Sequence, residues 1–155
     1  GAPRMTVEVR FIADAMLGRL ARWLRLLGFD TLYFRDIKDA DLLKHALREG
    51  RIILTRDTHF LRMKNLKNLC FVHSEKPVAQ LREVLAAFNL KASGIARCGS
   101  CNGILHEISE KERVHDLVPE HVFLNAKDFR KCAACGKVYW EGTHVRRFRE
   151  LLSIG

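Results

Sequence analysis

The sequence predicts an α/β fold in which a parallel sheet is flanked by helices and followed by a small C-terminal zinc ribbon. Two observations predict this fold class. Short apolar segments alternate with helix-period segments as far as residue 88, and two C-x-x-C pairs follow residue 97. Strands that are apolar on both faces are typical of parallel sheets covered by helices. We expect two domains, at residues 5–93 and 94–155, with the boundary at Ala92-Ser93-Gly94.

Strands and helices are expected to alternate along the α/β domain. Leucine and alanine at i, i+3, i+4 and i+7 spacing predict a first helix over residues 17–27. Asp39 and Asp41 are alternative N-caps of the second helix; only one of them can be the cap, which leaves the other free for another role. A shorter helical stretch is expected at residues 59–65, and Pro77 suits the first turn of a last helix. The buried face of the second helix should contain Leu42, Leu43, Ala46 and Leu47. The strands are expected at residues 7–13, 31–34, 51–55 and 69–72.

Four of the five cysteines form two close pairs, Cys98 with Cys101 and Cys132 with Cys135, separated by 30 residues. Two tight turns of this kind supply four thiolates, the closed tetrahedral set of a structural zinc site. Gly136 fits a turn that needs a positive φ. An odd cysteine count without a secretion signal argues against disulfides, and two pairs outside a strand-to-helix context argue against a redox role. A histidine could replace one cysteine as ligand; the candidates are His106, His115, His121 and His144. The residues Val138-Tyr139-Trp140 predict a ribbon strand.

The positive charge is concentrated in the N-terminal domain. The net charge is +9, and residues 1–97 carry 18 Lys and Arg against 10 Asp and Glu, whereas residues 98–155 carry 9 against 8. A polyanion is the natural partner for such an excess, and a solvated basic surface is the alternative. Arg130-Lys131 and residues 146–149 could likewise contact nucleic acid or face solvent. No apolar run approaches the ~20 residues that span a bilayer, so we expect a cytoplasmic protein with no membrane partner.

Acidic residues follow the predicted strands. Asp14 ends the first strand, Asp36 follows the second, and Asp57 follows the third; neither Asp14 nor Asp57 has an evident capping role. Asp41, or Asp39, begins the helix that leads into the third strand. The carboxyl ends of parallel strands meet at one edge, where ligands bind in open α/β sheets. Carboxylates gathered there would need a cation, and oxygen-only ligands suit Mg²⁺ or Mn²⁺. The alternative is that they are turn and capping residues.

Arginines lie close to these acidic positions along the chain. Arg19, Arg22 and Arg25 recur every three residues on the first helix, and Arg56 directly precedes Asp57. These four side chains are candidates for contacts with a phosphate backbone.

Two segments carry a family resemblance. The first is Phe11-Ile-Ala-Asp14-Ala-Met-Leu-Gly-Arg-Leu-Ala-Arg-Trp-Leu-Arg-Leu-Leu-Gly-Phe-Asp30-Thr, and the second is Ile53-Leu-Thr-Arg-Asp57. Together with the cysteine segment from Arg97 to His144, they resemble the Mut-seven C-terminal RNase domain family, a PIN-like nuclease fold followed by a zinc ribbon. The resemblance implies a metal-dependent ribonuclease whose acidic residues match Asp14, Asp41 and Asp57, with Asp36 and Asp39 matching less closely.

The leading functional hypothesis is therefore a ribonuclease that hydrolyses RNA with Mg²⁺ or Mn²⁺ held by Asp14, Asp41 and Asp57, and that contains a structural zinc. A second hypothesis is an RNA-binding or ribosome-associated module without catalysis, whose affinity should survive chelation of Mg²⁺. A third is a Mg²⁺-dependent phosphatase. The third is disfavoured because Asp14-Ala15-Met16 lacks the second acid of the D-x-D pair found in haloacid-dehalogenase-like phosphatases.

Overall fold

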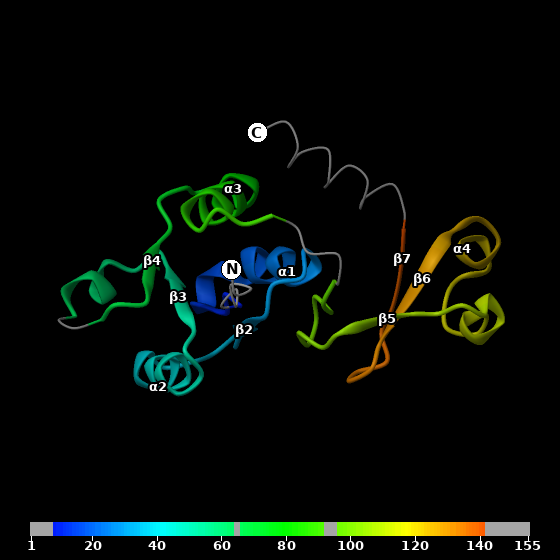
Figure 1. Cartoon of the computed structure of the whole chain (residues 1–155), viewed down its shortest axis with the longest axis horizontal. Helices are drawn as coiled ribbons and strands as arrows, with labels where there is room; N and C mark the ends of the chain where they lie inside the picture. Colours follow the sequence, from blue (N-terminus) through cyan, green and yellow to red (C-terminus); the bar gives the residue numbers. More distant parts are fainter. Residues whose placement is uncertain (1–7, 64–65, 92–95, 142–155) are drawn as a thin grey trace, which may run out of the picture.

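The computed structural model describes residues 8–63, 66–91 and 96–141, and its first sheet is parallel. The strand order is β2-β1-β3-β4, so β1 and β3 are the central strands. Helices flank this sheet, as Figure 1 shows, and the expected α/β class is confirmed. The strands are shorter than predicted. They are β1 (Phe11–Ala13), β2 (Thr31–Tyr33), β3 (Ile52–Thr55) and β4 (Leu69–Phe71).

Each face of the parallel sheet has its own apolar core. Helices α1 (Gly18–Leu26) and α3 (Pro77–Ala87) pack over one face, where Leu20, Leu24 and Leu81 are fully buried. Helix α2 (Asp39–Glu49) and the short 3-10 helix η2 (Thr58–Arg62) pack over the other, around Ile12 and Ile53. Alternation of side chains along each strand sends successive residues to opposite cores.

Helix α2 differs from its prediction in two respects. Its N-cap is Lys38, which makes no side-chain capping bond, so neither Asp39 nor Asp41 is the cap. Both aspartates lie in the first turn instead, where negative charge complements the helix dipole. Leu47 is 75% exposed, so its place in the buried face was wrong. Gly50 ends the helix with a left-handed φ of 64°, as its position suggested.

A three-stranded antiparallel sheet forms the ribbon, in the order β5-β6-β7. The long connection between β5 and β6 carries two short helices that enclose a small apolar core around Val114 and Phe129. These elements are β5 (Leu105–Glu107), η3 (Lys111–Val114), α4 (Glu120–Asn125), β6 (Lys127–Cys132) and β7 (Val138–Glu141), and β7 confirms the predicted ribbon strand.

Some predictions fall outside the part of the chain that the structure describes. These are the domain boundary at residues 92–94, His144 and the basic residues 146–149. Within the described ranges, no helix is long and apolar enough to cross a membrane.

Candidate functional site

Two aspartates meet at the edge where the four parallel strands end, which we call the carboxyl edge. Asp14 directly follows β1, and Asp57 lies two residues beyond the end of β3. Thr55 connects them: its Oγ1 donates to Asp14 Oδ2 at 2.8 Å and accepts from the Asp57 N–H at 2.9 Å. Thr55 is fully buried and Asp14 is 8% exposed. One buried hydroxyl therefore fixes both acidic residues at the end of the sheet.

Both aspartates also cap short 3-10 helices, so the prediction that they have no capping role was wrong. Asp14 Oδ1 accepts from the Ala15 N–H at 2.8 Å and begins η1 (Ala15–Leu17). Asp57 Oδ1 accepts from the His59 N–H at 2.9 Å and begins η2. An ionised carboxylate has about four lone-pair positions, so these bonds leave acceptor capacity for a cation.

The remaining acidic candidates approach the same edge from one side. Asp36 is exposed in the bend after β2. Asp39 and Asp41 lie in the first turn of α2, and this turn begins at the carboxyl edge because α2 follows β2 in the chain. Among the described residues, the only group of three or more potential ligands whose atoms lie within 4.8 Å of one another consists of cysteines. The aspartates are therefore not drawn into so tight a group, and their metal binding stays a prediction.

The arginines of α1 are spread along the sheet rather than gathered at its carboxyl edge. Helix α1 runs back from that edge, and three residues advance it by ~4.5 Å. Arg19 is exposed near its start, whereas the Arg22 side chain passes over Gly99 of the ribbon. Arg25 is buried, and its guanidinium donates to the carbonyls of Thr31 at 2.8 Å and Gly99 at 3.0 Å. The prediction that Arg25 contacts phosphate was therefore wrong.

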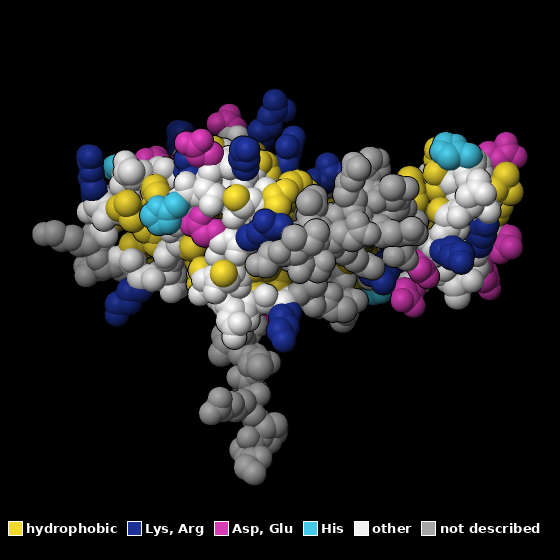
Figure 2. Space-filling view, turned by 90° about the horizontal axis from the view of Figure 1, so that it is seen from above, with side chains coloured by type: hydrophobic (Ala, Val, Ile, Leu, Met, Phe, Trp, Pro, Cys, Tyr) yellow, Lys and Arg dark blue, Asp and Glu magenta, His cyan; other side chains and the backbone are white. Residues whose placement is uncertain are grey.

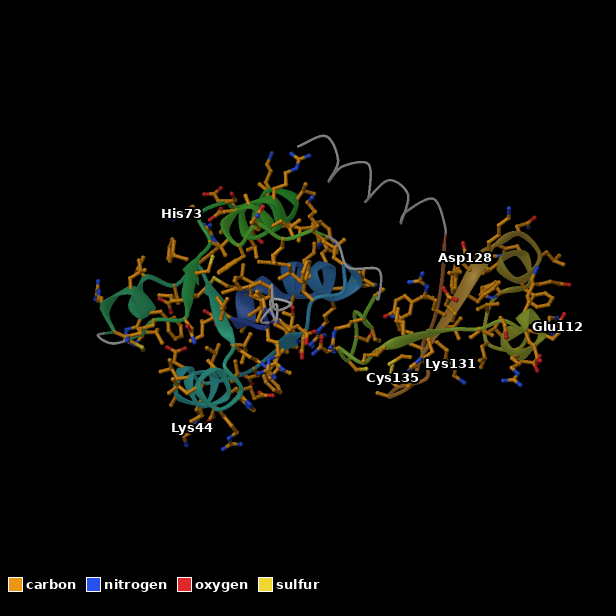
Figure 3. All side chains as sticks on the ribbon, in the orientation of Figure 1. Lys44, His73, Glu112, Asp128, Lys131 and Cys135 are labelled. Carbon is orange, nitrogen blue, oxygen red and sulfur yellow. The ribbon has the colours of Figure 1, made fainter. Side chains whose placement is uncertain are left out.

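Arg56 organises the loop after β4. Its Nη1 donates to the carbonyls of Val72, His73 and Ser74 at 3.0, 2.7 and 2.6 Å. Figure 3 labels His73 beside α3, and Glu83 of that helix accepts from the His73 and Ser74 N–H groups at 2.8 and 2.9 Å. This loop is thus held from both sides. A contact between Arg56 and phosphate stays a prediction.

The four cysteines of the two pairs come together in the ribbon. The Cys98 and Cys135 Sγ atoms are 3.7 Å apart, and those of Cys101 and Cys132 are 3.4 Å apart. Four thiolates at the usual Zn–S distance from a tetrahedral zinc would lie ~3.8 Å from one another. The donor set therefore fits a structural metal such as zinc, and no histidine of the described ranges belongs to the group. Figure 3 labels Cys135, in the turn between β6 and β7.

The two cysteine turns have the same backbone construction. In each, the N–H of the first cysteine bonds to a carbonyl five residues on, Gly103 at 2.7 Å or Lys137 at 2.9 Å. The residue after the second cysteine is left-handed in both, Asn102 with φ 73° and Gly136 with φ 79°. A Cβ on Gly103 would lie 2.7 Å from a cysteine sulfur, so the metal turn requires glycine there.

Tyr139 on β7 stabilises the first cysteine turn. Its hydroxyl lies 3.2 Å from Cys98 Sγ and accepts from the Gly99 N–H at 3.0 Å. Burial alone would raise the pKa of Cys98, but hydrogen bonds from Tyr139 and from the backbone of Cys101 and Ser100 lower it to about 6. The thiolate, the form that binds a metal, is thus favoured at this position.

The first cysteine turn packs against the edge where the parallel strands begin, the amino edge. Asn102 accepts from the Thr31 N–H at 3.0 Å and donates to Asp30 Oδ1 at 2.7 Å. Asp30 also accepts from Arg51 Nη1 at 2.8 Å. Burial would raise the pKa of Asp30, but the hydrogen bonds from Arg51 and Asn102 hold it below its usual value. The metal turn is therefore joined to the end of the sheet opposite Asp14 and Asp57.

Three residues with clear roles were missed from the sequence: Thr55, Asn102 and Tyr139. Thr55 carried a signal, because it is a polar residue ending an otherwise apolar strand. Asn102 stands where the second cysteine turn has glycine, which indicates a left-handed residue but not the partner of its side chain. Nothing in the sequence points from Tyr139 to Cys98.

One family model matches the chain. The family model described as the Mut7-C RNAse domain matches residues 9–152, which include both the carboxyl edge and the two cysteine turns. No curated protein and no solved structure matches the chain. The family description indicates a nuclease-type function, with RNA as the substrate. Because the match extends over most of its length, the chain belongs to the Mut7-C RNase domain family.

Proposed function

We propose that the chain is a PIN-like, metal-dependent ribonuclease that hydrolyses phosphodiester bonds of RNA at the carboxyl edge of its parallel sheet. The observation that carries the proposal is the hydrogen-bonded series from Asp14 through Thr55 to Asp57. It joins the Asp14 carboxylate to the backbone of Asp57 at the ends of the two central strands, where ligands of open α/β sheets bind. Family membership supports the same chemistry.

Asp14 and Asp57 would hold Mg²⁺ or Mn²⁺ directly. Mg²⁺ commonly keeps several waters and takes only one or two protein carboxylates, so a third close carboxylate is not required. Asp41, with Asp39 or Asp36, would reach the cation through bound water from the α2 side. When bound, such a cation neutralises charge on the phosphodiester and lowers the pKa of an attacking water. The chain's own contribution is to fix the Asp14 carboxylate and the Asp57 backbone through Thr55, and the Asp57 carboxylate through the His59 N–H.

The substrate backbone would lie along the exposed start of α1. Of the exposed arginines of α1, Arg19 lies closest along the helix to its start near Asp14, and it would contact a phosphate there. Figure 2 shows Lys and Arg side chains scattered among hydrophobic ones on the face seen from above.

The four cysteines would hold zinc in a structural role. Four thiolates complete a tetrahedral shell, which leaves no open position for a substrate or water. The cysteine turn lies at the amino edge, so the ribbon would act by stabilising the end of α1 and the start of β2.

One observation favours an alternative, a non-catalytic RNA-binding or ribosome-associated module. Asp14, Asp41 and Asp57 do not form a group of three ligands within 4.8 Å among the described residues. A module of that kind would bind RNA equally well with and without a divalent cation.

The decisive assay incubates the protein with end-labelled single-stranded RNA, duplex RNA and DNA, each with Mg²⁺, with Mn²⁺ or with no added divalent cation. We expect cleavage of RNA only with a cation. Asp14→Asn and Asp57→Asn should each abolish it while the thermal unfolding transition is retained. Thr55→Val, which removes only the connecting hydroxyl, should lower activity roughly 10- to 100-fold, whereas Thr55→Ser should keep it. Full activity in both asparagine variants would rule the proposal out.

A further inference from the structure

An aromatic side chain stands next to the acidic pair. In the parallel register of β1 and β2, Ala13 pairs with Tyr33, and Asp14 and Phe34 are the residues that follow. Neighbouring strands lie ~4.8 Å apart, so the backbones of Asp14 and Phe34 are adjacent at the carboxyl edge. Phe34, one residue beyond the end of β2, is therefore level with Asp14, one residue beyond the end of β1.

Phe34 faces the same side of the sheet as the acidic pair. Tyr33 points to the α1 side, where its hydroxyl donates to the Ala15 carbonyl at 2.7 Å. Alternation along the strand sends Phe34 to the α2 side, and its ring stacks on His45 of α2 with centroids 5.0 Å apart and planes at 25°. Thr55 is on this side as well, because the preceding residue packs in the α1 core.

The Phe34 side chain is held in place yet remains accessible. It is 38% exposed, whereas Ile12 of β1 and Ile53 of β3 are fully buried. Its stack on His45 restricts the ring, so binding a flat ligand costs little further conformational freedom. Arg35 and Lys38, both exposed, follow it in the loop to α2. A fixed aromatic face beside cationic side chains suits a nucleobase attached to a phosphate backbone.

We propose that Phe34 is a stacking platform for an unpaired nucleobase of the RNA held at Asp14 and Asp57. This inference rests on the proposed function and names its substrate class as single-stranded RNA. Bases in a duplex stack on one another and do not offer a free face, whereas unpaired bases stack on aromatic side chains. Phe34 thus selects single strands by contacting the nucleotide next to the scissile phosphate.

The test measures binding without cleavage. Fluorescence anisotropy of labelled single-stranded RNA, with Ca²⁺ in place of Mg²⁺ or Mn²⁺, compares the wild-type chain with Phe34→Leu, which keeps apolar bulk but has no aromatic face, and Phe34→Trp. We expect Phe34→Leu to weaken binding about 5- to 150-fold, the range for loss of one base stack, and Phe34→Trp to retain it. Leu47→Ala, at an exposed position on the far part of α2, is the matched control and should bind as wild type.

Two further measurements separate stacking from a packing role. Residual binding of duplex RNA should be equal in wild type and Phe34→Leu. A single abasic nucleotide, moved along the strand, should at one position erase the difference between the two proteins. The proposal is overturned if the wild type does not bind single-stranded RNA, if Phe34→Leu binds it as tightly as wild type, or if Phe34→Leu loses duplex binding to the same extent with a lowered melting temperature.

The outcomes also distinguish this inference from the ribonuclease proposal. Phe34-dependent binding without cation-dependent cleavage supports the platform and refutes the nuclease. Cleavage whose KM is the same in wild type and Phe34→Leu supports the nuclease and refutes the platform.

Discussion

Asn102 is one of the side chains that join the ribbon to the parallel sheet, and its replacement by glycine has a calculable effect. Glycine tolerates the φ of 73° at this position, just as Gly136 does at the same point of the second cysteine turn. Asn102→Gly therefore leaves the metal turn intact and removes only the two bonds to Thr31 and Asp30. The variant isolates the junction from the metal site.

The loss can be worked out bond by bond. The Thr31 N–H is fully buried and loses its partner, which costs about 1–3 kcal/mol. Asp30 loses a charge-assisted bond, worth about 1.5–3 kcal/mol, and keeps Arg51. Allowing for water entering the gap, we expect a net loss of about 3 kcal/mol in the free energy of unfolding. For a chain of this length, that lowers the melting temperature by about 6–12 °C.

Thermal unfolding by circular dichroism and zinc content by mass spectrometry test this together. Zinc content should be unchanged in Asn102→Gly. The matched control is Asn89→Gly, because Asn89 also has a positive φ, of 51°, but is exposed. It should change stability by less than about 0.5 kcal/mol. The reasoning is refuted if Asn102→Gly melts with the wild type, or if it loses its metal.

Three other predictions concern the arginines, pH and the metal. Arg19→Ala should weaken RNA binding and reduce the slope of its salt dependence by about 0.7 without changing the melting temperature. Arg25→Ala should instead lower the melting temperature, because two buried carbonyls lose their donor. RNA titrations over a salt series and thermal scans distinguish the two effects. The pKa of Asp30 is depressed in the folded chain. The ionised Asp30 side chain therefore contributes its full stabilisation above about pH 4, and this stabilisation is lost as the pH falls further. Below about pH 4, the denaturant midpoint should fall less steeply in Asp30→Asn than in wild type. One zinc per chain is expected, and chelation should remove amide-exchange protection from β5, β6 and β7 while β1 and β3 remain protected, as hydrogen exchange would record.

Much of the fold followed from local pattern. The apolar strands and the 3.6-residue periodicity predicted the sheet and its helices, because an element buried on both faces shows that burial in its own residues. The cysteine spacing predicted the metal turns, because two turns of identical length supply a complete ligand set. The positions of Gly50 and Gly136 followed from the need for a left-handed residue.

The errors concern side chains whose role depends on distant partners. Arg25 lies in a helical row of arginines that looks solvated, but Gly99, 74 residues away, supplies the carbonyl that holds it. Asp14 and Asp57 were expected to be free of capping roles, because their short 3-10 helices give only a weak periodic signal. Thr55 and Asn102 act through contacts that only the folded chain brings together. Local sequence pattern determines the helices and strands, whereas the roles of these side chains depend on how the helices and strands pack together.

The central claim is that Asp14 and Asp57 jointly hold a divalent cation at the carboxyl edge. Crystals of the chain soaked in Mn²⁺ and measured at the manganese absorption edge test it directly. The account predicts an anomalous peak within bonding distance of both carboxylates, absent from crystals of Asp57→Asn. Manganese bound only elsewhere on the chain, or a peak that persists unchanged in Asp57→Asn, would contradict it.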